Sequence, residues 1–161
     1  MSVLLAAYDL NSLKRDASAP PAYEYHDDTN WDWDAYEFDS VSQEKVHGVG
    51  VLPQAPVYNE QGDLTFRIKW RTDGSTTGTV RWRVAVLGRT HSESYDVTTT
   101  DTGDVDSART AANQELWADI TLTTPSLSPG DTLMFTVTRV ADHANDDYGA
   151  DASLTAVEIY S

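Results

Sequence analysis

The stretch Leu64-Thr-Phe-Arg-Ile-Lys-Trp-Arg71 decides the fold class. Large apolar residues alternate with polar ones along it, and a period of two is typical of a β-strand with one buried face. Val80-Arg-Trp-Arg-Val-Ala-Val86 repeats the alternation, and so does the run from Thr132 to Val140. The three runs predict a core made of Phe66, Ile68, Trp70, Trp82, Val84, Val86, Leu133, Phe135 and Val137.

Weaker strand candidates, separated by turn signals, fill much of the remaining sequence. They lie at 36–39, 45–51, 95–100, 116–123 and 153–160, whereas 101–113 reads as a polar loop. No segment shows a sustained helical period of apolar residues. The pattern predicts an all-β domain over residues 35–161, namely a single jelly roll or β-sandwich of about eight antiparallel strands.

Residues 1–34 differ in character and are predicted to form an extended, acidic, aromatic-rich N-terminal arm. The segment Asp16-Ala-Ser-Ala-Pro-Pro21 interrupts any regular element, and 23–34 holds four large aromatic residues among five acids. A disordered tail usually lacks such aromatics, so one interpretation is an arm that becomes ordered against a partner. The other is that Trp31 and Trp33 cover an open end of this chain's own domain.

Composition argues against several classes of function. The 161 residues carry a net charge of −15, which disfavours nucleic acid or an anionic membrane surface as a partner. The chain has no cysteine and no apolar run long enough to cross a membrane, so neither a disulfide framework nor a spanning helix is expected. Aspartate greatly outnumbers lysine; this bias suits high salt and a halophilic origin, and the alternative is simply an acidic, soluble surface.

Signals of catalysis are weak. The sequence contains no glycine-rich phosphate loop, nucleophile elbow or zinc-binding helix motif, and its four histidines are scattered. We therefore assign no catalytic residue and no cofactor. The loop 142–151 is a weak candidate for Ca²⁺ through Asp142, Asp146 and Asp147, but its spacing does not match an EF-hand. A solvated acidic loop is the preferred interpretation, because an acidic chain contains many of them.

A ladder of basic residues is the most informative candidate site. Residues 63–89 carry a net charge of +4, whereas the rest of the chain carries −19. Like charges on paired strands destabilise a sheet, so we expect either a negative partner over this face or acids on flanking strands that reach the basic heads. The predicted partner-binding residues are Trp31, Trp33, Arg67, Lys69, Arg71, Arg81 and Arg83.

Three ordered blocks of sequence carry a resemblance. They are Tyr36-Glu-Phe-Asp39 with Leu52-Pro53 and Gly62–Trp70, then Gly78–Val84, and finally Pro129–Arg139 with Asp146–Ile159. Together they resemble a family of small tailed-phage structural proteins, the jelly-roll decoration or head-fibre proteins. The resemblance leaves 1–34 outside and brings no catalytic residue. It implies an oligomeric virion component, and the acidic, lysine-poor composition departs from the usual phage member toward a virus of a halophilic host.

These observations predict a structural virion protein that decorates and stabilises the outside of a viral capsid. The expected partners are the major capsid protein and copies of the chain itself, as a homotrimer, with the N-terminal arm holding the domain to the shell. Two alternatives stay open. One is a host-recognition or carbohydrate-binding head, because exposed Trp and Tyr side chains stack on sugar rings. The other is a small single-jelly-roll major capsid protein.

Overall fold

The computed structural model describes residues 2–27, 32–60, 62–72, 77–94, 97, 100–123 and 125–161. Within these ranges the chain forms β-strands and no helix, and nothing there could cross a membrane as a helix. The strands are β1 (Leu4–Tyr8), β2 (Lys14–Arg15), β3 (Ala22–Asp27), β4 (Asp32–Phe38), β5 (Glu44–Val51), β6 (Leu64–Arg71), β7 (Thr79–Arg89), β8 (Asp101–Ala108), β9 (Glu115–Leu122), β10 (Thr132–Arg139) and β11 (Ala152–Tyr160).

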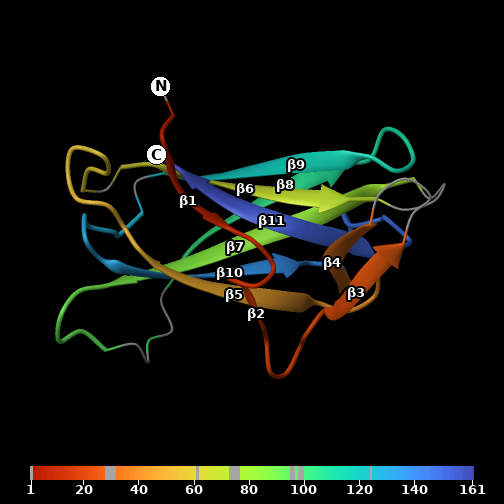
Figure 1. Cartoon of the computed structure of the whole chain (residues 1–161), viewed down its shortest axis with the longest axis horizontal. Coiled ribbons are helices and arrows are strands. Elements are labelled where there is room, and N and C mark those ends of the chain that lie inside the picture. The colour runs from red at the N-terminus through yellow and green to blue at the C-terminus, as the bar shows by residue number, and fades with distance from the viewer. Residues whose placement is uncertain are drawn as a thin grey trace.

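Two antiparallel sheets lie face to face (Figure 1). The first, called sheet A here, has the order β3-β4-β11-β6-β9, and β1 also pairs with β11. The second, sheet B, has the order β2-β5-β10-β7-β8. The prediction of an all-β antiparallel sandwich is confirmed. The long strands β6 and β7, adjacent in sequence, lie in different sheets, so their basic residues are not cross-strand neighbours.

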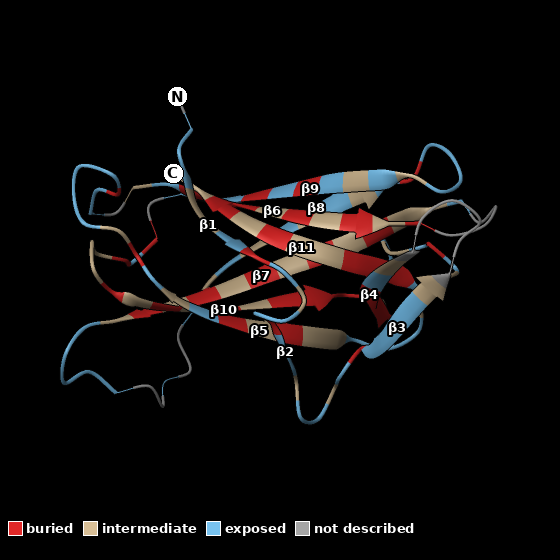
Figure 2. Cartoon of the chain, viewed as in Figure 1, coloured by how far each residue is buried: buried red, intermediate tan, exposed pale blue. Residues whose placement is uncertain are grey.

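The core lies between the sheets, where the inward residues of the alternating strands meet (Figure 2). All nine predicted core residues are buried. Aromatic rings fill its centre: Trp82 packs edge-on against Trp70 and Phe38, with ring centroids 6.2 and 5.2 Å away. Burying large apolar side chains of this kind is the main stabilising contribution to such a domain.

One strand was missed in the sequence. β8 covers Asp101–Ala108, which had been interpreted as polar loop, whereas Val97 and Thr100 of the predicted strand 95–100 are not in a strand. Residues 95, 96, 98 and 99 lie outside the described ranges. β8 is an edge strand with small or acidic side chains, and it forms because β7 supplies a full ladder of backbone partners. Apolar periodicity cannot reveal such a strand.

The N-terminal segment is built into both sheets, in contrast to the extended arm predicted for 1–34. β1 pairs with β11, β2 with β5 and β3 with β4, and residue 34 falls inside β4. Tyr8 and Leu13 are buried in the core. The hydroxyl of Tyr36 donates to the carbonyls of Leu10 and Leu13, which fixes the turn between β1 and β2 over the sandwich.

Candidate binding face on sheet A

The outer face of sheet A carries a row of ion pairs along β6. Arg67 makes a two-pronged hydrogen bond to Asp119 on β9, with both N–O distances 2.8 Å. Lys69 pairs with Glu158 on β11, and Arg71 pairs with Glu115 on β9 at 3.2 Å. The first half of the basic ladder is therefore neutralised by acids on flanking strands, the second of the two expectations from the sequence.

Two charged groups on this face have shifted pKa values. The hydrogen bonds that Arg67 donates to Asp119 raise the pKa of the Arg67 guanidinium. The hydrogen bonds that Glu158 accepts from Lys69 and Tyr160 lower the pKa of its carboxyl. Arg67 therefore stays protonated and Glu158 stays ionised at neutral pH, in positions set by the strand register.

Aromatic rings lie among these pairs and were not singled out in the sequence. Trp117 on β9 is 57% exposed, and the guanidinium carbon of Arg67 lies 4.6 Å from its ring centroid. The same carbon lies 5.1 Å from the ring of Tyr160 on β11. Cation–π contacts of this kind hold an exposed ring in place. We call Trp117, Arg67 and Tyr160 the aromatic stripe; it crosses β9, β6 and β11.

One member of the aromatic stripe, Trp117, could have been recognised from the sequence. Trp117 lies in the predicted strand 116–123, at a position whose neighbours along the same face are acids. Because side chains alternate between the two faces of a strand, a tryptophan on the polar side points away from the core. That the three groups meet could not be read from sequence, because β9, β6 and β11 become neighbours only through the sheet order.

Trp33 is placed differently from Trp117. The imidazole of His26 stacks on it with 4.0 Å between ring centroids, and the guanidinium carbon of Arg71 lies 4.7 Å from its centroid. The ring of Trp33 is therefore in contact with groups from β3 and from β6. This favours Trp33 as part of the domain's own packing, the second interpretation of the aromatic segment. Trp31 lies outside the described residues.

The second half of the basic ladder belongs to sheet B. Arg81 contacts Asp104 at 3.0 Å and Asp106 at 2.6 Å, and Arg83 contacts Asp104 at 2.7 Å. The hydrogen bonds from Arg83 and Arg81 lower the pKa of the Asp104 carboxyl. The ladder is thus divided between the two outer faces of the sandwich, and the structure does not bring its halves together.

The acidic side chains of the loop 142–151 bind other parts of the same domain. The side chain of Asp146 is fully buried and forms a two-pronged ion pair with the equally buried side chain of Arg139. Asp147 accepts from the backbone N–H of Thr79, and Asp142 accepts from Gln43. The preferred interpretation of a solvated loop is wrong for Asp146. No cluster of three or more His, Cys, Asp or Glu side chains suited to a metal occurs among the described residues.

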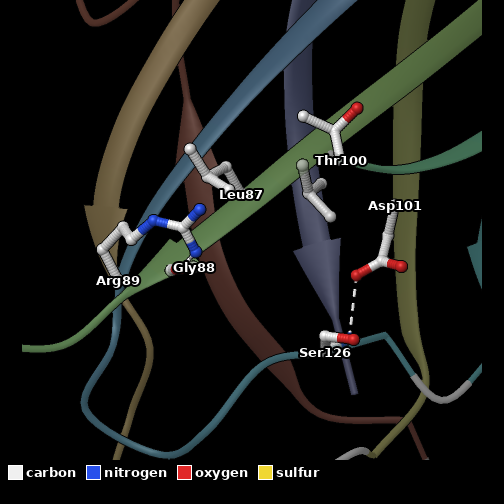
Figure 3. Close-up of a pocket in the computed structure, with 7 residues that line it drawn as sticks. Leu87, Gly88, Arg89, Thr100, Asp101 and Ser126 are labelled. Atoms are coloured by element: carbon white, nitrogen blue, oxygen red, sulfur yellow. Dashed lines mark hydrogen bonds between the residues drawn. The ribbon is translucent and has the colours of Figure 1, made fainter. Parts of the chain in front are cut away.

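The outer face of sheet B also carries a depression lined mainly by apolar side chains. This depression of about 460 Å³ lies over β5, β10 and β7, and its lining includes Val49, Leu87, Val97, Met134 and His47. Beyond it, at the end of β7, a smaller hollow of about 150 Å³ is bordered by Arg89 and by Asp101, whose carboxylate accepts from the Ser126 N–H (Figure 3). Sites for small organic ligands usually exceed roughly 300 Å³, so the smaller hollow is too small for one.

Comparisons with known proteins were made at the levels of sequence and structure. No family model and no curated protein matches the chain. Among solved structures, the carbohydrate-binding module TmCBM27, studied for specific mannan recognition, aligns over 100% of this chain and 98% of its own, with a TM-score of 0.50 and 10% identity. The chain shares the fold of that module. At this identity the likeness concerns the fold alone.

Two further carbohydrate-binding modules align at somewhat lower similarity. The module CBM36, solved with calcium and xylotriose, covers 98% of this chain and 100% of its own, with 12% identity and a TM-score of 0.48. The C-terminal CBM6 of the laminarinase LamC from Zobellia galactanivorans covers 100% of both chains, with 9% identity and a TM-score of 0.46.

Proposed function

We propose that this chain is a non-catalytic carbohydrate-binding module whose ligand lies on the outer face of sheet A against Trp117. The observation that carries the proposal is the 57% exposure of a tryptophan ring that Arg67 holds in place. A large aromatic side chain is usually buried or partly buried, so a ring that keeps this exposure with Arg67 and Lys69 beside it is available to a partner.

The chemistry of the face suits a sugar. The C–H face of a pyranose stacks on an aromatic ring, while its hydroxyls need donors and acceptors at the ring's edge. Around Trp117 the chain provides the guanidinium of Arg67 and the carboxylates of Asp119 and Glu115. All of them stand on paired strands, so little conformational entropy is lost on binding.

The charge of the face favours a neutral polysaccharide. Three cations on β6 are balanced by three acids on β9 and β11. The chain as a whole carries −15, so an anionic glycan is repelled at long range without gaining an unpaired cation at the stripe. The fold shared with a mannan-recognising module supports the same class of ligand.

Affinity electrophoresis in gels containing neutral polysaccharides, mannan and xylan among them, tests the proposal. Calorimetric titration of any hit then gives the dissociation constant. We expect Trp117→Ala to weaken binding by roughly tenfold or more, because a central aromatic contact contributes over about 1.4 kcal/mol. Tyr25→Ala is the matched control, since Tyr25 is 60% exposed on β3, away from the stripe. Undiminished binding by Trp117→Ala would overturn the proposal.

A second candidate is the decoration of a viral capsid. It requires an oligomeric chain, and the apolar hollow on sheet B is the observation that favours protein contact. Co-expression with a candidate major capsid protein, followed by co-sedimentation with assembled shells, tests this role. Shells that assemble without retaining the chain contradict it.

A further inference from the structure

The outer face of sheet B combines exposed aliphatic side chains with two lysines, Lys14 and Lys45, for which the described residues provide no acidic partner. Val49 and Val51 on β5 are 61% and 71% exposed, and Met134 and Leu87 continue the apolar surface onto β10 and β7. No acid in the described part of the chain lies within ion-pair distance of Lys14 or Lys45, which flank this surface. In a chain with 26 acids and 11 bases, unpaired lysines beside an apolar hollow point to a partner.

The register of sheet B arranges these residues in rows across the strands. One row runs Lys45, Thr138, Arg83, Asp104, from β5 over β10 and β7 to β8. Four positions further along the strands, a second row runs Val49, Met134, Leu87. The charged row has Lys45 at its β5 end and Asp104 at its β8 end, and the row His47, Thr136, Ala85 separates it from the apolar row.

We infer that sheet B is the interface of a homodimer, in which a second copy of this chain packs face to face on the hollow. A two-fold axis that runs along the strands between β10 and β7 exchanges β5 with β8 and β10 with β7. Each row of one copy then faces the same row of the other copy, with the order of the strands reversed. Lys45 then meets Asp104 of the second copy, and Met134 meets Leu87 of the second copy; symmetry makes each contact twice.

Apolar burial and charge complementarity both favour a second copy of the chain on this face. The apolar row becomes the dry centre of the interface, with the lysine–aspartate contacts at its rim. Asp104 already accepts from Arg81 and Arg83, and a carboxylate has capacity for a further donor. Two sandwiches that pack through twisted sheets form a further aligned layer of the kind seen within β-sandwich cores.

Sedimentation velocity of the full chain from micromolar to millimolar concentration tests the inference. We expect a monomer–dimer equilibrium. Met134→Glu should raise the dissociation constant by roughly a hundredfold or more, because each dimer would bury two unpaired carboxylates. Val49→Glu should act in the same direction, and its exposed position protects the fold. Lys45→Glu should weaken the dimer by placing it against Asp104.

Val41→Glu is the matched control, since it changes the net charge by the same amount on a residue that is 77% exposed in the β4–β5 turn. A chain that stays monomeric at every concentration overturns the inference. So does a trimer, or a dimer that Val49→Glu and Met134→Glu leave unchanged while circular dichroism shows both variants folded. Sugar binding at Trp117 is measured separately, so its failure leaves this result untouched.

Discussion

The buried ion pair between Arg139 and Asp146 makes a sharp prediction about stability. Both side chains are fully shielded from solvent. Besides its two bonds to Asp146, the guanidinium of Arg139 donates to the carbonyls of Phe38, Ala150 and Tyr148. The pair therefore ties the end of β10 to the end of β4 and to the loop before β11.

Replacing Arg139 by Met keeps an unbranched apolar stem and removes the guanidinium with its charge. Asp146 would then be a buried carboxylate whose remaining described contact is the Arg81 N–H at 2.9 Å. Removing one partner of a buried pair costs about 3–5 kcal/mol, because the other charge stays desolvated. For a domain of this size, that is a large share of a total stability of roughly 5–15 kcal/mol.

Urea unfolding followed by tryptophan fluorescence gives the measurement. Arg139→Met should lower the free energy of unfolding by about 3–5 kcal/mol, whereas Arg83→Met, which breaks a pair on the outer face of sheet B, should lower it by about 1 kcal/mol at most. The double variant Arg139→Met/Asp146→Leu should lose less than the sum of its single changes. A loss below about 1 kcal/mol for Arg139→Met would refute the reasoning.

Two further predictions concern burial. Burial raises the pKa of the Glu37 carboxyl, although Ser153 and His26 hydrogen-bond to it. Because its folded pKa lies above its unfolded value of about 4.3, its contribution to stability is greatest below that value and falls as pH rises through the folded pKa. Glu37→Gln should flatten this part of the pH dependence in urea titrations; an unchanged slope contradicts it. A Cβ on Gly48 would overlap the ring of Phe135, whereas one on Gly149 meets nothing within 4 Å. Gly48→Ala should therefore cost roughly 1–3 kcal/mol, and Gly149→Ala should stay within about 0.5 kcal/mol, as thermal unfolding can check.

Sequence periodicity was sufficient for the strands that bury a full apolar face. Phe66, Ile68 and Trp70 point inward as predicted, because a strand has only two faces and one must meet the core. It was insufficient for β8 and for the short N-terminal strands β1 to β3, which are held by backbone ladders and by a few buried residues such as Tyr8.

The charged residues show the other limit. The basic residues of β6 and β7 were assigned correctly to the polar faces of their strands, but their acidic partners depend on which strands become neighbours. Arg67 meets Asp119, more than fifty positions away in sequence, only because β9 pairs with β6. The burial of Asp146 likewise depends on Arg139 of the preceding strand, and acid-rich composition gave no sign of it.

The two proposed surfaces have a joint consequence, because they lie on opposite faces of one sandwich. A dimer through sheet B directs its two aromatic stripes outward in opposite directions. One short oligosaccharide cannot reach both stripes, so wild type and Val49→Glu should bind it with the same dissociation constant. A long or insoluble polysaccharide offers many chains, and a divalent dimer should be retained on it more tightly than the monomeric variant.

Pull-down on insoluble polymer, together with calorimetry on the oligosaccharide, separates the effect of divalency from the affinity of a single stripe. Equal retention of dimer and monomer on the polymer would contradict the outward arrangement, and unequal oligosaccharide affinities would mean that the sheet B face takes part in sugar binding.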